Sequence, residues 1–212
     1  TGGPFVSMVN VATSSDGSPV LLLSDLAQHT QNAKASPKVS LLFDTTDAAG
    51  TAASGARLTV TGTLAPSTGA CDRERYLSRH PSARDFATFA DFGFWRLEIA
   101  RGHLVAGFGR IVSLPAEQLR LDQHGIKWPA AEEGSVLSAL NADHTAALAA
   151  LGARLDQAVS PNLEATPTWR ACGLDPEGLD LVSGLRAVRL DFSPQVDTAD
   201  ALTAAVLSAA RG

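Results

Sequence analysis

The sequence predicts an α+β protein in which a barrel of antiparallel strands precedes a small α-β-β-β-α domain. Two observations support this prediction. Short β-rich runs separated by turn residues fill the first half of the chain, a pattern typical of a barrel. After Pro115 the residue pattern changes: a loop-like stretch rich in turn residues leads into a long helical run. We therefore expect two domains, at residues 1–130 and 131–212.

The first domain is expected to begin with a hairpin that turns at Asp16-Gly17. Ser24 or Asp25 is placed to cap a short helix, which Pro37 ends. A cleanly alternating strand follows a small polar loop at 44–55. The expected elements are strands at 5–11, 19–23, 39–43 and 57–64, helical segments at 26–35, 70–80 and 83–89, and a hairpin of strands 94–99 and 103–108 that turns at 100–102.

The second domain is expected to open with one long helix over residues 135–155, which contains Asn141, Asp143 and His144. We interpret those three side chains as a structural network rather than as a site. A hairpin of strands 168–172 and 179–182, a strand at 186–192 and an alanine-rich helix at 198–210 complete the α-β-β-β-α order.

Composition excludes several classes of function. The net charge is −5, which argues against broad binding to nucleic acid or to anionic membranes. No apolar stretch approaches the ~20 residues that span a bilayer. Cys71 and Cys172 lie far apart without a C-x-x-C spacing, so neither a disulfide framework nor a metal site is expected. We expect a soluble, cytoplasmic protein that binds neither nucleic acid nor membrane.

One segment has the pattern of a cofactor cradle. The apolar run at 21–23 ends in Ser24 and Asp25, and the helical stretch that follows carries His29, Thr30 and Asn32. A strand that ends in hydroxyls and leads into a helix N-terminus commonly binds an anion. The same side chains would equally well cap and solvate a short helix. The residues alone leave both interpretations open.

Three segments together resemble a known family. They are the strand–SDLAQHTQN–helix–proline–strand unit at 21–43, the run RLTVTG at 57–62, and the series RHP (79–81), DF (91–92) and VAGFG (105–109). This combination is similar to the split β-barrel family of pyridoxamine 5'-phosphate oxidases, and most closely to its haem-utilisation (HugZ-type) branch. The segment from Leu140 to the end resembles the small C-terminal domain that accompanies that branch. The resemblance implies an FMN-binding type of split barrel without its first strand, and a homodimer that shares its cofactor clefts.

The resemblance also implies which residues hold a cofactor. The positions that match the family's phosphate-binding cations are Ser7 and Ala12 on the first strand and His29 and Thr30 on the helix, and Arg57 matches a flavin-contacting residue. No Lys or Arg occurs between Thr1 and Gln31. Because charge-assisted bonds are about twice as strong as neutral ones, an FMN phosphate would be held weakly. The expected cofactor-binding residues are Ser7, Ser24, Asp25, His29, Thr30, Asn32 and Arg57.

Haem makes different demands, namely an apolar slot, an axial ligand and cations for its propionates. Arg57 is placed to serve a propionate. In the haem-utilisation branch the axial histidine lies near the C-terminal end, and no histidine follows His144 here. We therefore expect haem or a related tetrapyrrole at the dimer cleft, without naming its ligand, and with FMN as the alternative.

Three hypotheses follow. The first is a haem-utilisation-type dimer that binds haem, with haem degradation as a further activity. The second is an FMN-dependent oxidoreductase, with FMN between Ser24, His29 and Thr30 of one protomer and the partner's Arg57. The third is a non-enzymatic split barrel that binds another protein. The sequence contains no G-x-S-x-G, P-loop or H-E-x-x-H motif, so any chemistry would belong to a bound cofactor.

Overall fold

The computed structural model describes residues 3–44, 55–106, 109–121, 132–159, 168–196 and 198–211. Contacts divide the chain into a barrel unit, residues 1–122, and a C-terminal unit, residues 123–212. The boundary predicted between residues 130 and 131 lies outside the described residues, as do the loop predicted after residue 44 and His124.

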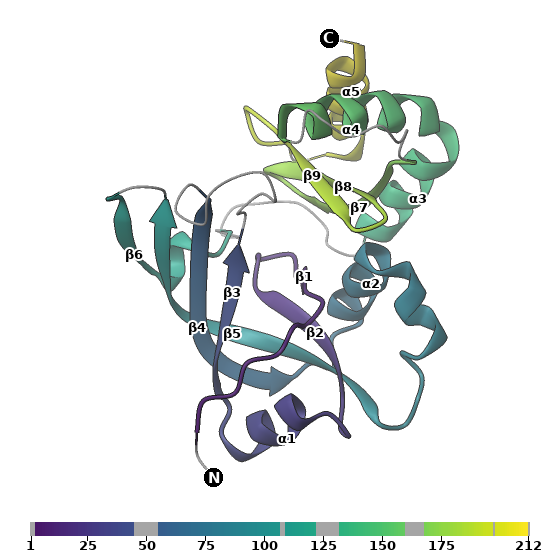
Figure 1. Ribbon diagram of the computed structural model, residues 1–212. Helices are drawn as coiled ribbons and strands as arrows, with labels where there is room; N and C mark the ends of the chain where they lie inside the picture. The colour runs from purple at the N-terminus through teal and green to yellow at the C-terminus, as the bar shows by residue number, and fades with distance from the viewer. Residues whose placement is uncertain are drawn as a thin grey trace. The chain divides into compact units, whose positions relative to one another are not determined.

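Within its described residues, the barrel unit is built on one antiparallel sheet of six strands (Figure 1). The strand order is β1-β2-β5-β4-β3, and β6 pairs with β5. This confirms the predicted α+β class with an antiparallel split barrel. The strands are β1 (Ala12–Thr13), β2 (Pro19–Ser24), β3 (Lys38–Asp44), β4 (Ala56–Pro66), β5 (Phe92–Ala106) and β6 (Ile111–Pro115). The helical segments are α1 (Gln28–Ala35), α2 (Ala70–Arg79), η1 (Pro81–Asp85) and η2 (Ala116–Gln118).

The predicted first strand at 5–11 is wrong. Residues 3–11 form no regular element, and β1 begins only at Ala12, which pairs with Val20. Val9 and Val11 pack against the barrel core, whereas the side chains of Phe5, Val6 and Met8 are 56%, 94% and 98% exposed. A β-rich alternation is not sufficient for a strand, because the backbone also needs a neighbouring strand to pair with.

Asp16 fixes the turn that joins β1 to β2. One carboxylate oxygen accepts hydrogen bonds from the Ser18 N–H, at 2.9 Å, and from the Ser14 hydroxyl, and the other accepts from Arg96 Nη2 on β5 at 2.6 Å. Burial alone would raise the pKa of Asp16, but these hydrogen bonds and the Arg96 charge together hold it below its ordinary value. The predicted Asp16-Gly17 turn is therefore present and is tied to the centre of the sheet.

β5 is one continuous strand, so the hairpin predicted over residues 94–108 is wrong. Gly102 had suggested a turn, but it lies within the strand. The position needs glycine because a larger residue would not fit there. A Cβ atom at Gly102 would lie 2.8 Å from Leu119 Cδ1 and 3.2 Å from Leu58 Cδ1. Glycine in a strand commonly marks such a close approach.

A β-bulge at Ala100 divides β5 into two halves. Thr61 pairs with Arg101 and Gly62 pairs with Ile99, so Ala100 is an extra residue on β5. Because side chains alternate along a strand, one extra residue reverses which of them face the core. The buried residues are Trp95, Leu97 and Ile99 before the bulge and Gly102 after it, while Arg101 and His103 are exposed.

The C-terminal unit has the predicted three strands and final helix, but its first helix is divided in two. α3 ends at Asp143 and is capped by His144, whose backbone N–H donates to the Leu140 carbonyl and whose own carbonyl accepts from the Leu148 N–H. Asn141 holds α3 against β7 through two bonds to the backbone of Ala171, at 2.8 and 2.9 Å. The elements are α3 (Glu133–Asp143), α4 (Thr145–Val159), β7 (Arg170–Asp175), β8 (Gly178–Ser183), β9 (Arg186–Asp191) and α5 (Ala199–Arg211), with strand order β7-β8-β9.

Packing in this unit predicts opposite effects for the same substitution at two helical glycines. A Cβ atom at Gly152 in α4 would lie 2.2 Å from Cγ of the buried Trp169, so Gly152→Ala should lower the free energy of unfolding by about 2 kcal/mol. At Gly134 in α3 a Cβ atom meets nothing within 4 Å, so Gly134→Ala should raise it by up to about 1 kcal/mol. Urea unfolding of the two variants measures both. Stabilisation by Gly152→Ala would contradict the packing of α4 on Trp169.

Among the described residues, none of the helices combines the length and hydropathy that crossing a lipid bilayer requires.

Candidate functional site

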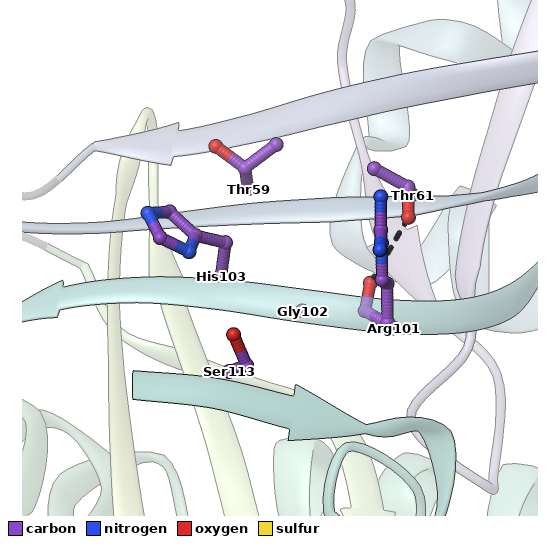
Figure 2. Close-up of a pocket in the computed structure, with 6 residues that line it drawn as sticks. All are labelled: Thr59, Thr61, Arg101, Gly102, His103 and Ser113. Carbon is purple, nitrogen blue, oxygen red and sulfur yellow. Dashed lines mark hydrogen bonds between the residues drawn. The ribbon is translucent and has the colours of Figure 1, made fainter. Parts of the chain in front are cut away.

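A cavity of about 250 Å³ opens on the outer face of the sheet, over β4, β5 and β6. Figure 2 shows side chains from the three strands gathered around it. Its lining residues are Thr59, Thr61, Arg101, Gly102, His103 and Ser113. We call it the sheet pocket.

The strand register explains why these residues meet. Thr59 pairs with His103, and His103 pairs with Ser113, so the three lie in one row across the sheet. Thr61 and Arg101 pair in the next row, and Thr61 Oγ1 donates to the Arg101 carbonyl at 3.4 Å. Paired residues point to the same side of a sheet, so both rows contribute side chains to one face. The bulge at Ala100 places Arg101 and His103 on that face.

The sheet pocket is rich in hydrogen-bond donors. Within the described residues, the guanidinium of Arg101 forms no ion pair, although the chain has 22 acidic and 17 basic residues. Three hydroxyls, from Thr59, Thr61 and Ser113, and the His103 ring add further donors. This set suits an oxyanion, because an ionised acceptor strengthens each of the hydrogen bonds it receives.

Apolar side chains flank the sheet pocket. Leu42 on β3 pairs with Thr59 and is 63% exposed, and Ile111 on β6 pairs with Val105 and is 64% exposed. The face therefore combines a cationic centre with an apolar surround.

Of the residues predicted from the sequence, Arg57 lies on this face. It is partly buried, two residues before Thr59 on β4, and the alternation of the strand places both side chains on the same side. Within the described residues its guanidinium, like that of Arg101, has no ion pair.

The other predicted residues gather around α1 instead. Ser7 Oγ and His29 Nδ1 lie 3.1 Å apart, which joins the N-terminal segment to the helix. Asn32 Oδ1 accepts from Gln28 Nε2 at 2.9 Å. Thr30 is fully buried, and among the described residues its Oγ1 has no hydrogen-bond partner. Its hydroxyl is therefore not on the surface, where a phosphate would arrive.

Ser24 and Asp25 do not cap α1, so that prediction is wrong. The helix begins at Gln28, and its N-cap Ala27 makes no side-chain bond. Ser24 Oγ instead accepts from the Leu26 N–H at 3.1 Å and donates to Asp91 Oδ2 at 2.7 Å. Asp25 forms a half-exposed ion pair with Lys34 at 2.7 Å. Both side chains already have partners within the chain.

Arg57 is far from α1 within one protomer. The Leu64 N–H donates to the carbonyl of Pro37, just after α1, at 2.8 Å. Arg57 is seven residues back along β4, which corresponds to about 23 Å at the usual rise of a strand. The seven predicted residues thus form separate groups in this chain, and their role in binding a cofactor stays a prediction.

Most of the sheet pocket was not predicted from the sequence. The alternation from Arg57 to Thr61 already placed three polar side chains on one face of a strand. Arg101 was assigned to a turn, so its position beside Thr61 was not foreseen. The sequence carries no clear signal for the bulge at Ala100, on which that position depends.

Residues 1–119 match the protein-family model described as CREG, beta-barrel. The chain is also 40% identical over 102 residues to the non-canonical haem oxygenase HOZ of Arabidopsis thaliana, a chloroplastic protein. That match covers 46% of this chain and 30% of the plant protein, so the chain spans less than a third of its curated relative.

Two solved structures resemble the whole chain. A protein of unknown function from Agrobacterium tumefaciens is 24% identical, with a TM-score of 0.79 over 98% of this chain and 84% of that one. A haem-binding protein from Mycobacterium smegmatis is 27% identical, with a TM-score of 0.54 over 99% of this chain and 86% of that one. With the family match, these likenesses confirm the split-barrel resemblance and agree with its haem-utilisation branch.

Proposed function

This chain belongs to the CREG β-barrel family, and on that premise we propose that it binds haem or a closely related tetrapyrrole at the sheet pocket. The observation that carries the proposal is the composition of the pocket. A guanidinium without an ion pair among the described residues, three hydroxyls and an imidazole meet there beside exposed Leu42 and Ile111. A tetrapyrrole matches this combination, because it joins an apolar ring to carboxylate side chains. The similarity to the mycobacterial haem-binding protein supports the same assignment.

His103 is the residue that we assign to the iron. Among the described histidines it is the one that lines the sheet pocket. His29 contacts Ser7, and His80 Nε2 lies 2.9 Å from the carbonyl of Val11. An imidazole nitrogen is a common axial ligand for haem iron, and iron held there would supply the redox chemistry.

We propose further that two copies of the chain enclose the ligand. A cavity of about 250 Å³ lies below the range of about 300–1,000 Å³ that encloses a drug-sized molecule, and haem is larger than most such molecules. A second protomer would cover the remaining surface and also the exposed Leu42 and Ile111. A cytoplasmic location, expected from composition alone, belongs to the same proposal.

Titration with haemin tests the binding. We expect a Soret band that is shifted from that of free haemin and saturates at a defined stoichiometry. His103→Ala should change the position of the band, because the iron loses its ligand, whereas His29→Ala should leave it unchanged. Size-exclusion chromatography with light scattering should report a dimer. A Soret spectrum identical to that of free haemin, with folded protein, would remove the proposal.

FMN serves as the competing ligand in the same experiment. No Lys or Arg precedes Lys34, so the start of α1 offers an FMN phosphate no Lys or Arg cation. The Thr30 hydroxyl is buried and does not reach the surface. We therefore expect no quenching of FMN fluorescence at micromolar protein. Tight FMN binding would favour the oxidoreductase alternative.

Degradation is a separate step of the proposal, motivated by the name of the plant relative. With ascorbate and oxygen present, a haem-degrading protein would bleach the Soret band. Added catalase and superoxide dismutase would stop the bleaching only if free peroxide or superoxide were needed. A stable band under these conditions would limit the function to binding.

A further inference from the structure

We propose that Arg101 and its neighbouring hydroxyls form a carboxylate site that anchors one propionate of the tetrapyrrole. The inference rests on the proposed function and adds which group of the ligand enters the sheet pocket and which residue selects it. The fixed charge of Arg101 provides the attraction, and Thr59, Thr61 and Ser113 surround it with donors.

The backbone around Arg101 is arranged to present this side chain. The bulge at Ala100 turns Arg101 outward, in a strand whose preceding alternate residues all face the core. Gly102, the next residue, fits closely against Leu119 and Leu58. Bulges occur often beside functional sites, where they re-aim a side chain.

Among the residues that the structure describes, the charge of Arg101 has no ion-pair partner. Elsewhere in the described structure, Arg96 pairs with Asp16 at 2.6 Å and Arg186 pairs with Asp156 at 2.9 Å. Arg101 has no carboxylate beside it in the described residues, only hydroxyls and the His103 ring. A guanidinium presents its donors in a planar fork that matches both oxygens of a carboxylate. A carboxylate of a bound ligand would therefore be a suitable partner for Arg101.

The sheet pocket is large enough for an end group of the tetrapyrrole but not for the whole macrocycle, which would lie across its opening. About 250 Å³ admits a short carboxylate arm, while the exposed side chains of Leu42 and Ile111 lie beside the opening and offer an apolar surface to the ring. A phosphate shares the chemistry of a carboxylate at this site, so the test must separate the two sources.

The test compares two ligands that differ only in their carboxylates, haemin and haemin dimethyl ester. Arg101→Gln should weaken haemin binding about tenfold, because a charge-assisted contact is lost, and should leave the affinity for the ester unchanged. Arg84→Gln is the matched control. Arg84 is exposed, and its ion pair with the exposed Glu74 is long, at 3.6 Å. The control should change neither affinity. Arg101→Lys should recover part of the loss, and near-ultraviolet circular dichroism should confirm that each variant is folded.

The outcomes separate this inference from the proposed function. If the protein binds neither haemin nor its ester, the proposed function fails, and the carboxylate site fails with it. If it binds both ligands equally and Arg101→Gln has no effect, the proposed function stands and the carboxylate site is overturned. If Arg101→Gln weakens FMN but neither riboflavin nor haemin, the pocket takes a phosphate and the propionate assignment is wrong.

Discussion

Gly62→Ala is expected to lower the free energy of unfolding of the barrel unit by about 3 kcal/mol. Gly62 lies opposite the bulge at Ala100, where β4 and β5 approach closely. A Cβ atom at this position would lie 2.1 Å from the Glu98 carbonyl oxygen and 3.1 Å from Leu97 Cδ1. The nearest obstacle is backbone, so it cannot be relieved by rotating a side chain. The strands would have to separate beside the buried Leu97.

Gly93→Ala is the matched control on the same sheet. The nearest atom to its added Cβ would be Trp95 Nε1 at 3.6 Å, an ordinary van der Waals distance, so stability should change by less than about 1 kcal/mol. Urea unfolding gives the free energies, and hydrogen exchange of peptides from β4 and β5 locates the loss. A Gly62→Ala variant as stable as the parent would show that β4 and β5 do not approach as closely at the bulge as these distances require.

Arg189→Met is expected to cost the C-terminal unit about 3 kcal/mol. Arg189 Nη2 donates to Asp175 at 2.7 Å, and Nη1 donates to Asp180 at 3.0 Å. Burial alone would lower the pKa of Arg189, but its hydrogen bonds to Asp175 and Asp180 and their charges raise that pKa above its ordinary value. The guanidinium therefore stays protonated. Asp175 is buried, and without Arg189 its carboxylate keeps only the Glu177 N–H, at 2.9 Å, among the bonds described.

Two further variants test this explanation. Asp191→Ala removes a third contact of Arg189, at 3.3 Å, but the Asp191 side chain is 85% exposed, so the loss should stay below about 1 kcal/mol. Adding Asp175→Asn to Arg189→Met should restore at least half of the lost stability, because no unpaired charge stays buried. Equal losses for Arg189→Met and Asp191→Ala would mean that the buried pair is unimportant. Chemical denaturation with hydrogen exchange over β7–β9 measures all three.

Local chemistry predicted those elements whose limits depend on neighbouring residues in the sequence. Pro37 ends α1 as expected, and the predicted strands at 179–182 and 186–192 correspond to β8 and β9 within a residue or two. Alternation likewise found β4. These features depend on proline geometry and on side-chain periodicity, both of which are visible in a short stretch of sequence.

The errors arose where distant packing decides the structure. Gly102 is a close contact with Leu119 and not a turn, and only the fold brings those two residues together. The segment at 5–11 has the composition of a strand but no sheet neighbour. His144 interrupts a run of helix-forming residues, because Asn141 is bound to β7 on one side and a second helix starts on the other. The sheet pocket depends on the bulge at Ala100, which was not predicted from the sequence, so the pocket was not predicted either.

The bulge at Ala100 also separates two tasks along one strand. The half of β5 before it supplies Trp95, Leu97 and Ile99 to the interior, and the half after it supplies Arg101 and His103 to the outside. Under the proposed function, substitutions of the outward-facing Arg101 and His103 should therefore alter ligand preference at little cost to folding. On a barrel built this way, the choice of guest molecule can therefore depend on a few outward positions, while the hydrophobic interior depends on others.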